Sequence, residues 1–379
     1  MPEASPQDST DDTSQVAVPQ KPHRPWWKQA ISVGITLVVL IAVFGFVLPK
    51  LADYRSIVEY IGSISSLEWI VLGLASTAFL FAYPVVLEQV MQTLRLREAF
   101  ANHMTGTAIT NSVPSGGALA LPVNYTMYMS WGFTPESISA ALLAAGVWDW
   151  FGRISLPVLA VVGVALLGDA VWWMWIVSIV GVLTVTAMVV VLVKILGRET
   201  GARRMAQWID RIGSSLFERV KRDKPDIESA VMQFRRDLNS IVTTRATRLT
   251  AATIFNHVAM ATLFTVSVYA VGVTRDQIPI PWVVLAFALG RFLVMIPVSP
   301  GGLGLVDLGW IGLLTLGWQT TNPDLPVDHD IISAGVLLFR GLSLLPPIPI
   351  GMASWLFWRA NKSWRREWQI VRRGETTAA

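Results

Sequence analysis

Hydrophobic residues dominate the chain in long runs that carry almost no charge. The runs Ile31–Pro49 and Val171–Val193 contain no charged residue at all, and about 20 apolar residues are enough to span a bilayer core. Further segments of similar character follow at Trp69–Met91, Met104–Trp131, Ser137–Leu167, Thr250–Val271, Pro281–Pro297, Gly301–Gly317 and Ile331–Trp358. The pattern predicts an all-α polytopic membrane protein.

Two of these apolar segments are interrupted by proline and glycine. The stretch "ITNSVPSGGALALPVNY" holds Pro114, Gly116 and Gly117, and "IPVSPGGLGLVDLGW" holds Pro300 and a run of glycines. Proline and glycine are the poorest helix formers. Irregular backbone at membrane depth survives only inside protein or beside a wet cavity. Both segments are therefore predicted to be re-entrant or broken helices.

Basic residues predict the orientation of the chain. They flank the first apolar run, fill the loop between Lys194 and Arg248, and recur in the tail "RANKSWRREWQIVRRG". By the positive-inside rule all three regions are cytoplasmic, so the number of crossings is even and about eight, with at least one interrupted segment not crossing. We expect a multi-pass protein of the plasma (inner) membrane with both termini in the cytoplasm.

A weak internal repeat links the two halves of the chain. Pro114-Ser115-Gly116-Gly117 parallels Pro300-Gly301-Gly302, and "AAGVWDWFGRISLP" later parallels "SAGVLLFRGLSLLP". Paired interrupted segments in two halves are a sequence sign of a transporter site near the membrane midplane. The predicted regions are a disordered tail 1–25, a first membrane half 26–197, a basic amphipathic linker 198–248, a second membrane half 249–358 and a basic tail 359–379. A cleaved signal peptide is the rival interpretation of the first run, but no small-x-small cleavage site follows it.

Composition agrees with this interpretation. Of 379 residues, 53% are hydrophobic and 15% are charged, and there are 17 tryptophans, which is more apolar surface than a soluble domain of this length needs. The absence of cysteine excludes disulfides and thiolate metal sites. The net charge of +4 is attributed to cytoplasmic loops rather than to nucleic-acid binding.

Three stretches resemble a known family. "PVSPGGLGLVDLGWIGLLTLG" is similar to the Pro-Gly-Gly-Leu-Gly-Val-Val-Glu signature of the lysylphosphatidylglycerol synthase transmembrane-region family, also called flippase-like or YbhN-like proteins. "NSVPSGGALALPVNYTMYMSWGFTPES" resembles an earlier motif of that family, and "GVLLFRGLSLLPPIPIG" resembles its last helix. The resemblance covers roughly Trp26 to Trp358.

The resemblance implies movement of a lipid or lipid-linked intermediate between leaflets. This chain departs from the family's pattern at Asp307, where glutamate is usual, and it ends about twenty residues after its last helix. We therefore expect no aminoacyl-transferase activity from this chain, no cofactor, and a separate enzyme as the source of the lipid. The expected partners are membrane lipids: an anionic or zwitterionic phospholipid, or a polyprenyl-phosphate-linked lipid. No oligomeric state is predicted.

Backbone and side chains at the breaks suggest a binding site. Free N–H groups at a helix start suit phosphate, and glycine permits close approach. The alternative is that these glycines only let helices pack closely. The predicted substrate-binding residues are Pro114, Gly116, Gly117, Asp149, Arg153, Arg291, Pro300, Gly301, Gly302, Gly304, Asp307 and Arg340.

The charged members of this set lie within apolar segments, where charges are costly and point to function. Asp149 and Arg153 are four apart and can pair on one helix face, and Arg340 can pair with Asp307 or with a lipid phosphate. Structural pairing and headgroup contact both remain open for each arginine. His103, Asn111, Asn124, Asn256 and His257 are interpreted as interhelical hydrogen-bonding residues, with a proton relay through His257 as the alternative.

Other classes of function have less support. The sequence has no Walker loop, no nucleophile elbow and no metal-ligand spacing, so no catalytic residue is predicted. A membrane enzyme acting on a polyprenyl- or phospholipid-phosphate stays open because "TTNPDLPVDHD" carries Asp324, Asp328 and Asp330. A non-catalytic scaffold recruited through the basic loop and tail is the third hypothesis.

Overall fold

The computed structural model describes residues 53–112, 116–168, 171–197, 227–294 and 304–365. Within these ranges the chain is helical and has no β-strand. The helices in chain order are α3 (Tyr54–Gly62), α4 (Ser66–Val90), α5 (Leu96–Ser112), α6 (Gly116–Ser130), α7 (Pro135–Leu166), α8 (Trp172–Gly197), α10 (Ile227–Ala270), α11 (Ile280–Leu293), α12 (Leu305–Thr321), α13 (His329–Leu344), α14 (Pro347–Ala360) and the 3₁₀ turn η3 (Lys362–Trp364). The prediction of an all-α polytopic membrane protein is confirmed.

Length and hydropathy make five of the described stretches candidates for crossing a membrane. They are Ser66–Val90, Pro135–Leu166, Trp172–Val191, Thr244–Ala270 and His329–Ala360. The predicted run Ile31–Pro49 and the greater part of the predicted amphipathic linker, residues 198–226, lie outside the described residues. The count of about eight crossings therefore stays a prediction.

Local sequence explains where the long helices begin. Ser65 accepts the Glu68 N–H with its hydroxyl, and the Glu68 carboxylate in turn accepts the Ser65 N–H, which forms a capping box at α4. Thr134 caps α7 ahead of Pro135, a residue that suits the first turn of a helix. The Asp328 carboxylate accepts the first free N–H groups of α13.

Each interrupted segment consists of two short antiparallel helices that pack together. In the first, the Asn102 side-chain amide on α5 donates to the Asn124 carbonyl on α6 at 3.0 Å. In the second, α11 packs against α12, with Gly317 of α12 against the Trp282 ring of α11. The helices end and restart on either side of the Pro114 and Pro300 motifs. We call these pairs the first hairpin (α5–α6) and the second hairpin (α11–α12).

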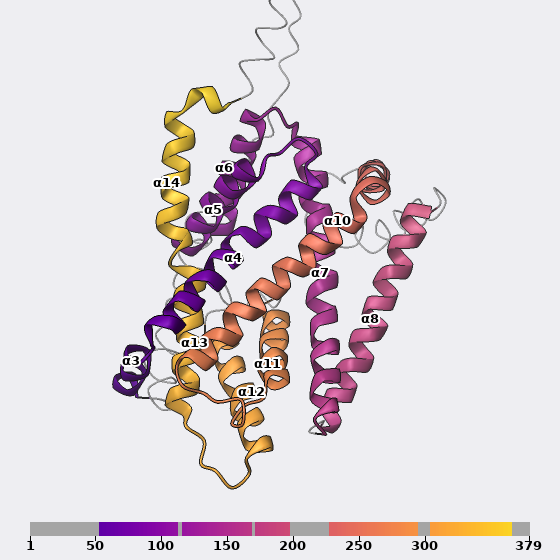
Figure 1. The fold of residues 1–379 in the computed structure, drawn as a ribbon. Helices are drawn as coiled ribbons and strands as arrows, with labels where there is room; N and C mark the ends of the chain where they lie inside the picture. The colour runs from indigo at the N-terminus through magenta and orange to yellow at the C-terminus, as the bar shows by residue number, and fades with distance from the viewer. Residues whose placement is uncertain (1–52, 113–115, 169–170, 198–226, 295–303, 366–379) are drawn as a thin grey trace, which may run out of the picture.

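The two halves repeat the same series of elements: a long helix, a hairpin, and a closing helix. The first series is α4, α5, α6 and α7, and the second is α10, α11, α12 and α13. Long helices α4 and α10 run side by side in opposite directions, with the first hairpin toward one end of the molecule and the second toward the other (Figure 1). The first hairpin packs on α14 through α5, and the second packs on α7 through α11. The repeated Ala-Gly-Val motifs lie on the closing helices α7 and α13.

Two apolar cores accompany the two hairpins. One joins α10, α11, α12 and α13 around buried rings such as Phe264, Trp310 and Phe339. The other gathers residues from α4, α6 and α7, such as Met127 and Tyr128, and includes Trp358 of α14. Helix α8, which is almost wholly apolar and packs mainly on α7, leaves most of its surface exposed, as expected for a face toward lipid.

The boundary predicted between linker 198–248 and the second membrane half lies inside a helix. Helix α10 begins at Ile227 and continues without a break to Ala270. The described part of the linker is therefore the start of the helix that enters the bundle.

Candidate functional site

A cluster of charged side chains, here called the ionic centre, joins the two halves of the chain. Its residues come from α7, α10, α11, α12 and α13 and are Asp149, Arg153, His257, Arg291, Asp307 and Arg340. Each of these segments is predominantly apolar, so each charge depends on its neighbours for stabilisation.

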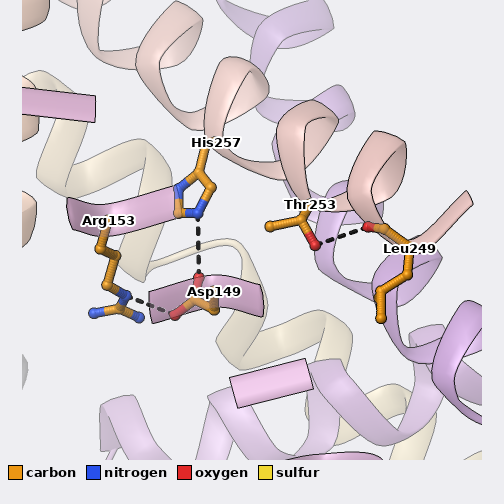
Figure 2. Close-up of polar contacts among 5 residues, drawn as sticks. All are labelled: Asp149, Arg153, Leu249, Thr253 and His257. Carbon is orange, nitrogen blue, oxygen red and sulfur yellow. Dashed lines mark hydrogen bonds and ion pairs between the residues drawn. The ribbon is translucent and has the colours of Figure 1, made fainter. Parts of the chain in front are cut away.

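Asp149 is the acceptor at one side of the ionic centre. Its Oδ2 accepts a hydrogen bond from Arg153 Nε at 2.6 Å, one turn further along α7. Its other oxygen, Oδ1, lies 3.5 Å from His257 Nε2 on α10. Figure 2 shows the carboxylate between the guanidinium and the imidazole. Thr253, drawn in the same view, donates to Leu249 of its own helix and so stays outside the ionic centre.

A glycine creates the space for this contact. A Cβ at position 152 would collide with the His257 ring, so α7 and α10 approach closely only because residue 152 is glycine. The imidazole is 4% exposed, and neither ring nitrogen has a hydrogen-bond partner in the described part of the chain. His257 is thus held beside Asp149 by packing rather than by a tight hydrogen bond.

Asp307 and Arg340 form a buried ion pair at the other side. Arg340 Nε donates to Asp307 Oδ1, and Asp307 Oδ2 accepts the Gly304 N–H at 2.9 Å. Gly304 has φ of 88°, a left-handed conformation that favours glycine. Asp307 therefore caps the start of α12 and neutralises Arg340 at the same time. The Arg340 guanidinium also lies over the Trp310 ring, 4.6 Å from its centroid.

Arg291 lies between the two pairs. It occupies the last turn of α11 and is within electrostatic range of Arg153, Asp149 and Arg340. Its Nε is buried and has no hydrogen-bond partner among the described residues. Among the described residues, the three arginines and two aspartates of the ionic centre carry one net positive charge when His257 is neutral. An anion with several acceptor oxygens would complement this arrangement.

The structure separates the predicted glycines by role. Gly116 lets the two backbones of the first hairpin meet, because a Cβ there would collide with the backbone of Ile109 and Thr110. Gly117 has open space around it and lines a cavity in that hairpin. None of the described lining residues of that cavity belongs to the ionic centre. Pro114, Pro300, Gly301 and Gly302 lie outside the described residues.

Polar residues predicted to bond between helices do so in part. The Asn111 side-chain amide donates to the Leu344 carbonyl at 3.0 Å. Tyr83 on α4, which the sequence analysis missed, links two regions: its ring lies 4.7 Å from the His103 ring, and its hydroxyl is within electrostatic range of Asp149 and Arg153. Trp310 was also missed. Glycines opposite bulky rings, such as Gly290 against Trp310, are visible only once the helices are packed.

Comparison with known proteins identifies the family of this chain. The family described as Lysylphosphatidylglycerol synthase TM region matches residues 29–351. The chain belongs to this family. This chain is also 26% identical, over 247 residues, to a UPF0104 membrane protein of Methanothermobacter thermautotrophicus. The aligned region covers 64% of this chain and 70% of that protein. The resemblance in the sequence motifs is thus confirmed across most of the chain, and the protein is a multi-pass membrane protein.

Proposed function

We propose that this protein moves a phospholipid or a lipid-linked intermediate between the two leaflets of a membrane. The observation that carries the proposal is the unbalanced positive charge of the ionic centre, with the buried Nε of Arg291 lacking a partner among the described residues. A lipid phosphate supplies the matching negative charge and acceptor oxygens.

The hairpins support a path for the headgroup. At 1.5 Å per residue, α6 and α11 are about 21–22 Å long, which is short of the roughly 30 Å hydrocarbon core. Helices of this length fit a re-entrant hairpin that brings irregular backbone to membrane depth. Because the hairpins lie toward opposite ends of the bundle, we propose that a headgroup reaches the ionic centre from each leaflet along one of them.

Charge at the two ends of the bundle supports the proposed orientation in the membrane. Arg97, Arg245 and Arg365 lie at the end that holds the α4–α5 link and the C-terminal end of α14. The other end, with α3 and the α12–α13 link, carries Asp53, Asp328 and other acidic residues. By the positive-inside rule, the basic end, which holds the C-terminal end of α14, is proposed to be cytoplasmic. The basic N-terminal flank, outside the described residues, is proposed to lie on the same side, and the plasma membrane is the proposed location.

The two alternatives from the sequence have less support in the described residues. Among those residues no group of three His, Cys, Asp or Glu side chains could hold a metal. The acidic residues near the α12–α13 link are used structurally, since Asp328 accepts from Tyr60 and Asp330 accepts the Asp53 N–H. A separate enzyme that makes the transported lipid is the partner this function requires.

A charge variant tests the proposal. Full-length protein is reconstituted into vesicles with a fluorescent phospholipid, and dithionite reports the fraction reaching the outer leaflet. Arg291→Gln should slow this movement, while Arg359→Gln, an exposed arginine at the end of α14, should not. Equal rates for both variants and the wild type would remove the ionic centre from the path.

A further inference from the structure

The first hairpin contains a cavity that is distinct from the ionic centre. Its volume is about 230 Å³, and its polar lining consists of His103, Thr107 and Thr110 from α5 and Asn124 from α6. Drug-sized ligands occupy pockets of roughly 300–1,000 Å³, so this cavity suits a small group such as part of a lipid headgroup.

Glycines shape this cavity. Gly106 faces the Asn124 side chain so closely that a Cβ would lie 2.5 Å from its Nδ2 atom. Gly117 lines the cavity on α6 with open space around its Cα. The two helices therefore approach closely at Gly106 and leave room beside Gly117.

The hydrogen-bonding groups in the cavity are uncharged and incompletely paired. Asn124 Oδ1 is buried and has no hydrogen-bond partner in the described part of the chain. The Thr110 hydroxyl donates to the Gly106 carbonyl at 2.8 Å, so its oxygen remains available as an acceptor. A buried polar atom without a partner destabilises the fold, and a hydrogen bond from a ligand would remove that cost.

The chemistry of these groups selects a ligand class. Asparagine, threonine and neutral histidine each offer both a donor and an acceptor. A phosphate only accepts, and an ammonium only donates, so each would leave part of the lining unpaired. A hydroxyl group does both. Among the described residues that line the cavity, none is charged, so neither ion is favoured.

We infer that the first hairpin holds a binding site for the hydroxyl groups of a lipid headgroup, such as a sugar or another polyol. The inference deepens the proposed function, because it assigns the uncharged part of the headgroup to this cavity and the phosphate to the ionic centre. Tyr83 connects the two sites, since its ring contacts His103 and its hydroxyl is within electrostatic range of Asp149.

Native mass spectrometry of the full-length protein tests this site without requiring transport. The protein is released from vesicles containing equal amounts of a glycosyl diacylglycerol, phosphatidylglycerol, phosphatidic acid, phosphatidylethanolamine and phosphatidylcholine. Wild type should retain the first two over the other three. Asn124→Leu and Thr107→Val should each reduce that preference by roughly two- to tenfold, the size expected for one uncharged hydrogen bond.

Two further variants make the result specific. Thr77→Val, on an exposed face of α4, should keep the wild-type preference. Arg291→Gln should keep the preference for hydroxyl headgroups even if it abolishes lipid movement, so failure of the proposed function and failure of this site are distinguishable. Phosphatidic acid retained as well as phosphatidylglycerol, or a preference unchanged in both cavity variants, would overturn the assignment.

Discussion

Gly152 shows how a single small residue sets the geometry of the ionic centre. A side chain at this position of α7 would occupy the space of the His257 ring, whereas Gly146 on the same helix has nothing near its missing Cβ. The two glycines therefore form a matched pair for testing the contact between α7 and α10.

Gly152→Ala should lower the stability of the protein by ~1–3 kcal/mol, because an added methyl overpacks a tight interface. Gly146→Ala should leave stability unchanged or slightly raised, since alanine favours a helix over glycine. Unfolding in mixed micelles titrated with a denaturing detergent measures both. Equal stabilities for the two variants would mean that His257 does not occupy the space beside Gly152.

Substitutions at Asp307 and Arg340 should have non-additive effects on the stability of the protein. Asp307→Asn keeps an oxygen to cap α12 but leaves the buried Arg340 without its carboxylate, so it should cost ~3–5 kcal/mol. Combining it with Arg340→Met should restore part of that loss because no buried charge then remains unpaired. The same unfolding measurement gives the coupling. A double variant less stable than Asp307→Asn would contradict the pairing.

Sequence spacing revealed only one of these contacts. Asp149 and Arg153 are four apart on one helix, so their pairing could be expected from the sequence alone. Asp307 and Arg340 are 33 positions apart, and they were proposed only because each needed a partner. The approach of His257 to Asp149 depends on how α7 and α10 cross, which no local pattern encodes.

At the scale of elements, the interrupted segments were predicted to be re-entrant or broken helices, but the packing of their halves on each other was not predicted. Proline and glycine show where a helix stops, whereas the antiparallel packing of α5 on α6 depends on contacts such as Asn102 to Asn124. The short helix α3 was missed because its nine residues are amphipathic rather than apolar.

A short hydrogen bond helps to hold helix α3 against the α12–α13 link. The Tyr60 hydroxyl donates to Asp328 Oδ2 at 2.6 Å, and this bond raises the pKa of Tyr60 to about 12. A raised pKa means that the bond stabilises the fold below the usual tyrosine pKa of about 10 and is lost as pH rises through 12. Tyr60→Phe should therefore speed amide exchange in α3 at neutral pH. Unchanged exchange would show that α3 is anchored by other contacts.

The hairpins predict a pattern of accessibility that cysteine labelling can read, because the chain has no cysteine of its own. Single cysteines at Thr93 and Gly132, which flank the first hairpin, should react with an impermeant reagent from the cytoplasmic side. A cysteine at Leu325, in the α12–α13 link, should react from the opposite side. Ser112→Cys, next to the first hairpin's tip, should resist labelling from the side that labels Leu325→Cys. Rapid labelling of Ser112→Cys from that side would show that α5 crosses the membrane.

At the scale of the whole molecule, the chain consists of two similar series of helices. Each series contributes a long helix, a hairpin and a closing helix, and charges from both series meet in the ionic centre. The sequence motifs anticipated this repeat, since Ala-Gly-Val recurs on α7 and α13. The packing of α4 along α10, which brings the series together, could not be seen in the sequence (Figure 1).

The central claim is that this arrangement lets a lipid headgroup cross between leaflets. The most direct measurement is the dithionite assay on wild-type protein in vesicles that carry probe lipids with different headgroups. In protein-free vesicles dithionite reduces only the probe in the outer leaflet. With wild-type protein we expect it to reduce nearly all of the probe, because inner-leaflet probe reaches the outer leaflet. Arg291→Gln should slow the reduction of this inner-leaflet probe. The proposal would be contradicted if folded wild-type protein left as much probe protected from dithionite as protein-free vesicles do. This result would have to hold for every headgroup, with and without an imposed ion gradient.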